Sequence, residues 1–285
     1  MQFKSYFPYL HASGRIALKD TDETTGGCYQ ISTLAPGNIQ SVPDSTKKYK
    51  GNAEGRRKME KIILLLVLSL AMNLAMSVDV RQVATIYDLP DFNVGGAWCE
   101  RIEYCPELDS CVPSIGNDVV SSACVLGIWL FYSENFYNYE DYGSVEWIYG
   151  DDVCENLETV GDQVSSLKYV GHLFEWKKNT MNLYELDLFA GLEFHEWNST
   201  AEVPALSGVG SVIVTGTQSW TLYTLPDYSG DSACLTVESG KFAGFAADIT
   251  ALGIGTVGSF RLGCFSDRTI RLDSDRHGVA VKARK

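Results

Sequence analysis

The chain has 285 residues, a formal net charge of −13 and a composition that is 45% hydrophobic and 12% aromatic. Such a composition excludes a disordered or collagenous chain, and the excess of acidic groups argues against a nucleic-acid partner and favours cations. The length leaves room for one large domain or two small ones once a leader is removed.

An apolar run occupies residues 62–72 and follows the basic residues Arg56, Arg57, Lys58 and Lys61. It is too short to span a bilayer comfortably, and the small-x-small triplet that ends at Ser77 is typical of a signal-peptide cleavage site. A start at Met59 would bring the run to the usual position of a signal sequence. We therefore expect a signal peptide over 59–77, and an upstream extension over 1–58 that is disordered or not translated. A signal anchor is the alternative.

Cysteine usage agrees with export. Seven cysteines follow the leader, and an oxidising compartment would pair most of them. They are Cys99, Cys105, Cys111, Cys124, Cys154, Cys234 and Cys264. Because seven is odd, one stays unpaired or bridges two chains. Asn198-Ser199-Thr200 is a glycosylation sequon that is usable in the secretory route.

A short phrase recurs four times: an aromatic residue, four intervening residues, a second aromatic residue and a nearby glycine. Three copies are Tyr87 to Phe92 with Gly95, Tyr184 to Phe189 with Gly191, and Tyr223 to Tyr228 with Gly230. The fourth lies within 129–143, where the register is open between Tyr132 with Tyr137 and Tyr137 with Tyr142. The copies start with alternating apolar residues, which are typical of a half-buried strand.

A second phrase follows each copy, at residues 116–122, 160–166, 206–211 and 254–259. Each one leads into a short strand-like segment that is closed by glycine. Ordinary tyrosine-rich hairpins are the alternative interpretation. Four tandem copies with a matched second phrase favour a repeated structural unit instead.

The two phrases resemble the Greek-key motif of the βγ-crystallins, and the resemblance covers residues 83–265. It implies an all-β fold of two βγ-crystallin-like Greek-key β-sandwich domains with two motifs each, at residues 78–178 and 179–265. The third strand of each motif would cross to the partner sheet. We expect the basic tail over 266–285 to be disordered, with binding to an anionic surface as the alternative.

This motif assignment also suggests disulfides. We expect Cys234 to pair with Cys264, and Cys99 with Cys124, as bridges within one motif. Cys105 and Cys111 could close a small loop. Sequence alone cannot fix the connectivity.

Calcium sites of this family resemble the phrase Asn/Asp-Asn/Asp-x-x-Ser/Thr-Ser, and hard oxygen ligands of this kind suit calcium. Residues 117–122 match it at every fixed position, and residues 161–166 match it except at the first. The resemblance implies a first site from Asn117, Asp118, the Val119 carbonyl, Ser121 and a carbonyl near Ser133, and a second from Asp162, the Gln163 carbonyl, Ser165 and the Asp88 carbonyl. Local hydrogen bonds between these side chains and the backbone are the alternative. The phrases at 206–211 and 254–259 have no carboxylate and carry glycine where the hydroxyl should stand, so they lose the ligands.

No catalytic constellation is visible, since His172, His195 and His277 lack metal-ligand spacing and a neighbouring nucleophile motif. We therefore expect a secreted, extracellular calcium-binding protein with a structural or binding role, and not an enzyme. Calcium and another extracellular protein are the expected partners, with no membrane span in the mature chain. One alternative is a secreted inhibitor or a defence or toxin-associated factor that uses the stretch 99–114. The other is a lectin-like module that uses surface Trp and Tyr, and the fold does not choose among the three.

Overall fold

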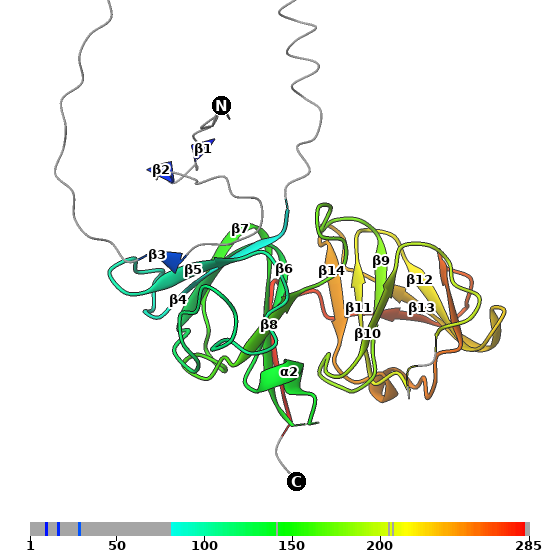
Figure 1. Ribbon diagram of the computed structural model, residues 1–285. Helices are drawn as coiled ribbons and strands as arrows, with labels where there is room; N and C mark the ends of the chain where they lie inside the picture. The colour runs from blue at the N-terminus through cyan, green and yellow to red at the C-terminus, as the bar shows by residue number, and fades with distance from the viewer. Residues whose placement is uncertain are drawn as a thin grey trace, which may run out of the picture. The chain divides into compact units, whose positions relative to one another are not determined.

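The computed structural model describes residues 81–282 except 141, 205 and 207, which belong to one compact unit (Figure 1). It also gives the backbone of three two-residue strands, β1 (Tyr9–Leu10), β2 (Ile16–Ala17) and β3 (Cys28–Tyr29). The expected signal peptide and most of residues 1–58 lie outside the described residues. Within the described part, no helix is long and apolar enough to cross a membrane.

The first domain is built around two long, paired strands. Its elements are β4 (Val83–Tyr87), β5 (Trp98–Arg101), β6 (Ser122–Tyr132), β7 (Gly143–Asn156) and β8 (Ser166–Tyr169). β4 pairs with residues 122–126 of β6 and β8 pairs with residues 129–132, so β6 contributes to both layers. The register of β6 against β7 shifts beside Gly127, whose φ of 105° is favourable only for glycine.

The second domain contains two separate four-stranded sheets, ordered β10-β9-β11-β14 and β15-β12-β13-β16. Their bounds are β9 (Thr180–Tyr184), β10 (Glu193–Glu196), β11 (Ser211–Thr215), β12 (Trp220–Leu225), β13 (Ser229–Thr236), β14 (Ala243–Ala246), β15 (Ser259–Leu262) and β16 (Thr269–Arg271). A single 3-10 turn, η1 (Thr250–Leu252), precedes β15. β14 crosses to pair with β11, while Thr200 bridges back to Phe260, so each motif lends its third strand to the other sheet. The all-β, Greek-key prediction is confirmed.

Each of the four hairpins contains two consecutive residues in the left-handed region. They are Asp91 and Phe92, Phe136 and Tyr137, Leu188 and Phe189, and Asp227 and Tyr228, with φ between 53° and 61°. The turn brings the two aromatic rings of each phrase edge to face, with centroids 5.7–6.4 Å apart. In the second motif the paired rings are Tyr132 and Tyr137, which settles the register that the sequence left open. The segment α2 (Asn135–Asn138) is therefore this left-handed turn rather than a regular helix.

One serine closes each hairpin. Its Oγ donates a hydrogen bond of 2.6–2.7 Å to a hairpin carbonyl and accepts one of 2.9–3.2 Å from the N–H of the second aromatic residue. The four serines are Ser122, Ser166, Ser211 and Ser259. These bonds satisfy buried backbone groups that the left-handed turn removes from the sheet ladders.

The end of the chain differs from the expected disordered tail. β16 pairs in parallel with β13, and β17 (His277–Lys282) pairs antiparallel with β7 of the first domain. In Figure 1, β17 is the red strand that lies among the green strands of the first half. Residues 269–271 and 277–282 are therefore ordered strands. β17 is held by its backbone pairing with β7, since Val279 and Val281 face solvent and Ala280 packs against apolar residues of the first domain.

Two of the three expected disulfide pairings are present. Cys234 pairs with Cys264 and Cys105 with Cys111, as predicted. The pairing of Cys99 with Cys124 is wrong, because β4 lies between their strands. Cys124 instead bonds Cys154, its direct neighbour in the antiparallel register of β6 and β7.

A buried aromatic cluster joins the two domains. Trp147 and Tyr149 of β7 contact Phe245 of β14, with ring centroids 4.7 and 5.9 Å away. Tyr132 donates a hydrogen bond of 2.8 Å from its hydroxyl to the carbonyl of Phe189. The cluster consists of Ile128, Leu130, Tyr132, Val145, Trp147, Tyr149, Val170, Trp176, Tyr184, Phe189, Ile213, Ala243 and Phe245. It is distinct from the separate apolar core of each domain.

A buried ion pair lies beside this cluster. Lys168 of β8 places its ammonium 3.0 Å from Glu193 Oε2 of β10 and over the ring of Tyr184, 4.6 Å from its centroid. The Tyr104 hydroxyl donates to Glu193 Oε1 at 2.9 Å. Burial alone would raise the pKa of Glu193, but Lys168 and His195 lower it to about 2. The Glu193 carboxylate is therefore charged across the neutral range. Its cation, Lys168, belongs to the first domain, so the ion pair links the two domains.

Lys168→Met is expected to lower the free energy of unfolding by about 3–5 kcal/mol, because it leaves the Glu193 carboxylate buried without its cation. Lys168→Met with Glu193→Leu should restore at least half of the loss in urea unfolding of the mature chain. The stabilisation from Glu193 should be complete above its ordinary pKa of 4.5 and decline as the pH falls toward 2. A single variant that costs less than about 1 kcal/mol would contradict a buried pair and match a surface one.

Candidate functional site

The phrases at 117–122 and 161–166 lie against each other in the first domain with local two-fold symmetry. The N–H of Asp118 donates to the Val164 carbonyl at 3.2 Å, and the N–H of Asp162 donates to the Val120 carbonyl at 2.9 Å. Both aspartates have left-handed backbones, with φ of 55° and 57°. This conformation, which Asp tolerates better than most residues, turns each carboxylate toward the opposite motif.

The first oxygen cluster contains Ser121, Asp162 and the Asp88 carbonyl. Ser121 Oγ lies 2.6 Å from Asp162 Oδ1 and 2.9 Å from the carbonyl oxygen of Asp88. The second cluster is its symmetry counterpart. There, Ser165 Oγ lies 3.2 Å from Asp118 Oδ1 and 3.0 Å from the carbonyl oxygen of Ser133.

The two serines are exchanged relative to the sets expected from the sequence. Asp118 does meet the hairpin of Ser133, and Asp162 that of Asp88, but each aspartate meets the serine of the other phrase. The exchange follows from the antiparallel approach of the phrases, which brings position two of one phrase beside position five of the other. Val119 and Gln163, whose carbonyls complete the expected sets, directly follow the two aspartates in the chain.

A further oxygen beside the second cluster has no hydrogen-bond partner among the described residues. It is the buried Asn117 Oδ1, whereas Asp88 Oδ1, also buried without such a partner, faces Gly96 in the first hairpin. Buried acceptors of this kind are costly unless a cation or water satisfies them, and calcium takes six to eight oxygen ligands. The residues present therefore fit a hard cation. No group of three Asp, Glu, His or Cys side chains gathers anywhere in the described ranges, so each cluster relies mainly on neutral oxygens.

An open hollow of about 640 Å³ adjoins the second cluster. It is lined by Asn117, Asp118, Ser133 and Ser165, by Asp162 and Gln163 of the other phrase, and by Glu134, Asn135, Phe136, Tyr139, Glu140 and Tyr142 of the hairpin segment. Phe136 and Tyr139 on that segment are 53% and 57% exposed. The sequence marks this stretch by its aromatic phrase within 129–143, and such a local pattern gives no sign of the hollow.

In the second domain the equivalent positions are closed by backbone. The N–H groups of Gly210 and Gly258 donate to the carbonyls of Tyr184 and Tyr223, as those of Ser121 and Ser165 donate to Tyr87 and Tyr132. A Cβ at Gly210 would lie 2.2 Å from the Leu186 carbonyl carbon, and one at Gly258 would lie 2.4 Å from that of Leu225. The second domain therefore lacks both the liganding side chains and the space for them.

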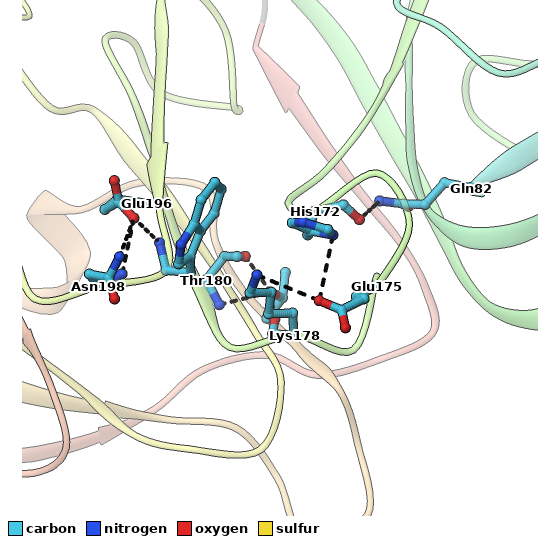
Figure 2. Close-up of polar contacts among 9 residues, drawn as sticks. Gln82, His172, Glu175, Lys178, Thr180, Glu196 and Asn198 are labelled. Atoms are coloured by element: carbon cyan, nitrogen blue, oxygen red, sulfur yellow. Dashed lines mark hydrogen bonds and ion pairs between the residues drawn. The ribbon is translucent and has the colours of Figure 1, made fainter. Parts of the chain in front are cut away.

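The three histidines considered above pair with carboxylates. Figure 2 shows His172 and Lys178 directed toward Glu175, at 3.8 and 3.5 Å. Lys178 also lies over the ring of Trp197, 4.5 Å from its centroid. Asn198 of the sequon is exposed, and its side chain donates to Glu196 at 3.2 Å. The contacts of Glu175 and Lys178 are surface contacts, and the one between Lys178 and Trp197 ties the segment before β9 to the second domain.

Gly258→Ser is expected to lower the free energy of unfolding by about 1–3 kcal/mol, because its Cβ would collide with the hairpin backbone. Gly255→Ser is the matched control, since no atom lies within 4 Å of the position of its Cβ and its cost should stay within about 0.5 kcal/mol. Thermal and urea unfolding of the mature chain would measure both. Equal costs for the two variants would contradict the closed hairpin.

No family model matches the chain, and no curated protein matches it. Among solved structures, it is similar to Geodin, a βγ-crystallin from Geodia cydonium, with 21% identity over 64% of this chain and 99% of that chain and a TM-score of 0.48. It is also similar to an archaeal βγ-crystallin, with 20% identity over 30% of this chain and 96% of that one and a TM-score of 0.26. Protein S, solved in complex with calcium, shows 14% identity over 65% of this chain and 100% of its own, with a TM-score of 0.23.

Likeness at these identities concerns the fold alone. The stronger observations are internal: four hairpins with paired aromatic rings, four closing serines, and third strands that cross between motifs. The chain therefore has two all-β domains of two Greek-key motifs each, as its repeats predicted, and the solved structures to which it is similar include βγ-crystallins.

Proposed function

We propose that the protein is a secreted, non-enzymatic calcium-binding βγ-crystallin with a structural or binding role. Its first domain binds one calcium ion at each of the two oxygen clusters. The observation that carries the proposal is the symmetric convergence of Asp118 with Ser165 and of Asp162 with Ser121, each beside a hairpin carbonyl. The buried Asn117 Oδ1, which has no hydrogen-bond partner among the described residues, supports it.

Each ion would join the two motifs of the first domain. One motif supplies the carboxylate and the carbonyl that follows it, at Val119 or Gln163, and the other supplies the serine. The hairpin carbonyls come from Ser133 and Asp88. With a single carboxylate in each cluster, we expect dissociation constants on the order of 10⁻⁵ to 10⁻³ M, in the range of extracellular calcium modules. A hundredfold excess of calcium over Kd would then stabilise the folded state by about 2.7 kcal/mol for each site.

Calorimetric titration of the mature chain should give two bound calcium ions. Asp118→Ala with Ser165→Arg removes two groups of one cluster and should leave one ion bound. Asp118→Ala with Ser121→Arg removes one group from each cluster and should leave none. These two variants share one substitution and differ only in the serine that is changed.

The reverse order of stoichiometries would show that each phrase forms its own site and that the crossed arrangement is wrong. A wild-type chain that binds no calcium at 10 mM would sink the proposal itself. Circular dichroism in chelator establishes that the variants are folded, so that loss of calcium binding can be distinguished from unfolding.

Export is supported by the three disulfides and by the exposed Asn198. Material secreted from eukaryotic cells should begin near Val78 and carry an N-glycan at Asn198. Intact mass before and after glycosidase treatment measures both, and Asn198→Gln should remove the glycan alone. Retention of residues 1–77 in the secreted protein would refute the signal peptide.

A second candidate function, carbohydrate binding, is favoured by the hollow beside the Asp118 cluster. Its exposed Phe136 and Tyr139 could stack on a sugar ring while the bound ion takes hydroxyl oxygens. A glycan array probed in calcium and in chelator separates this function from a purely structural role, because only the former gives calcium-dependent binding.

A further inference from the structure

The segment that follows β16 leaves the second domain and crosses to the first. Its Asp273 carbonyl accepts a hydrogen bond of 2.7 Å from the N–H of Phe245 in β14. The next carbonyls bond only to the first domain. Ser274 accepts from the Tyr149 hydroxyl at 2.8 Å, and Arg276 accepts from the Tyr149 N–H at 2.9 Å. The crossing therefore takes place within three residues, over the aromatic cluster that joins the domains.

β17 then extends the sheet of the first domain. Its six residues pair in order with β7, from His277 opposite Ile148 to Lys282 opposite Gly143. Gly278 lies flat against the indole of Trp147, where a Cβ would come within 2.3 Å of the ring. At the far end, the Lys282 ammonium returns to the second domain and lies 2.7 and 2.9 Å from the two carboxylate oxygens of Asp187. The segment is thus held by the second domain at both ends and by the first domain in between.

The centre of this contact is a buried carboxylate. Glu146 of β7 is 1% exposed and accepts hydrogen bonds of 2.9, 2.9 and 3.0 Å from the N–H groups of Glu158, Thr159 and Val160. His277 Nε2 forms an ion pair with the same carboxylate, while a quarter of the His277 side chain remains exposed to solvent. Because the three backbone bonds hold Glu146 independently, β17 contributes the imidazole to a preformed anionic site.

We propose that residues 272–282 form a latch that fastens the second domain to the sheet of the first, and that protonated His277 on Glu146 keeps it closed. Deprotonation of His277 weakens the latch, so its opening increases as the solution turns alkaline. The latch acts on the contact between the domains and requires no bound calcium.

The direction of the effect follows from the charges around the pair. Its hydrogen bond to Glu146 raises the pKa of His277 against the opposing effect of burial, and Glu155 and Glu158 raise it further. Burial would raise the pKa of Glu146, but His277 and the three backbone N–H groups hold it below its ordinary value. The stabilisation from His277 is complete below its ordinary pKa of 6.5 and is lost as the pH rises through the raised value. The stabilisation from Glu146 is complete above 4.5 and is lost only in acid.

Hydrogen exchange of the mature chain in chelator, followed by mass spectrometry between pH 5.5 and 9.5, tests the latch. After correction for the intrinsic exchange rate, peptides from 272–282 should lose protection as the pH rises across this range, because His277 loses the charge that pairs with Glu146. Peptides from β11, whose backbone pairs with β9 and β14 and not with the latch, are the internal control. The imidazole titration of His277 by NMR should give a midpoint above 6.5.

Three variants separate the charge from the strand. His277→Gln should show low protection of 272–282 with little pH dependence. Lys282→Ala, which keeps His277, should lower protection at every pH but retain the dependence, and Lys241→Ala is its matched control with the same loss of charge. In Gly278→Ala the added methyl group would collide with the Trp147 ring and separate β17 from β7. Protection of 272–282 should therefore fall at every pH.

Constant protection of wild-type 272–282 across the pH range, or His277→Gln with undiminished pH dependence, would overturn the proposal. Because every measurement is made in chelator, failure of the latch and failure of calcium binding are distinguishable.

Discussion

The fold depends on one small device, the left-handed hairpin that a serine hydroxyl closes. Two consecutive residues with positive φ cost free energy, and they take N–H and C=O groups out of the sheet ladders. The closing serine restores one donor and one acceptor, and the paired aromatic rings cover the turn. All four motifs contain this device, so the chain turns in the same way at each hairpin. In the second domain, consecutive motifs exchange their third strands.

The residue before the closing serine differs between the two domains. Where it is Ser121 or Ser165, a hydroxyl stands between an opposing carboxylate and a hairpin carbonyl. Where it is Gly210 or Gly258, the hairpin backbone occupies that space. The two domains therefore share one scaffold and differ in chemistry by a side chain that the local packing either admits or forbids. This difference explains why the oxygen clusters are confined to one domain of the described chain.

The hairpins could be predicted because they leave local marks in the sequence, and the same holds for the Asp and Ser side chains that meet in the two oxygen clusters. The aromatic spacing, the closing serine and the Asp-x-x-Ser pattern each lie within a few residues of one another. The exchange of Ser121 and Ser165 could not be predicted, because it depends on how two phrases more than forty residues apart approach. The bond between Cys124 and Cys154 likewise depends on the register of β6 against β7.

The strand at the end of the chain was missed for a different reason. The residues Gly278 to Val281 carry the alternation of a strand, but the surrounding basic residues gave the segment the composition of a solvated tail. The burial of Lys168 could not be predicted for the same reason, because a lysine within a short strand is usually exposed. In both cases a buried carboxylate on a distant strand makes the difference, Glu146 for His277 and Glu193 for Lys168. A sequence does not reveal such a partner when it is more than twenty residues away.

Because of the carboxylates Glu193 and Glu146, the stability of the contact between the domains depends on pH. Lys168 and His195 lower the pKa of Glu193 to about 2, so acid weakens the contact progressively below the ordinary pKa of 4.5. Alkali acts on the other pair, since His277 is the group with the raised pKa and Glu146 stays ionised. The apolar cluster around Trp147 and Phe245 has no such dependence. The aromatic cluster therefore supplies attraction at every pH, while the two ion pairs favour one arrangement of the domains between acid and alkaline limits.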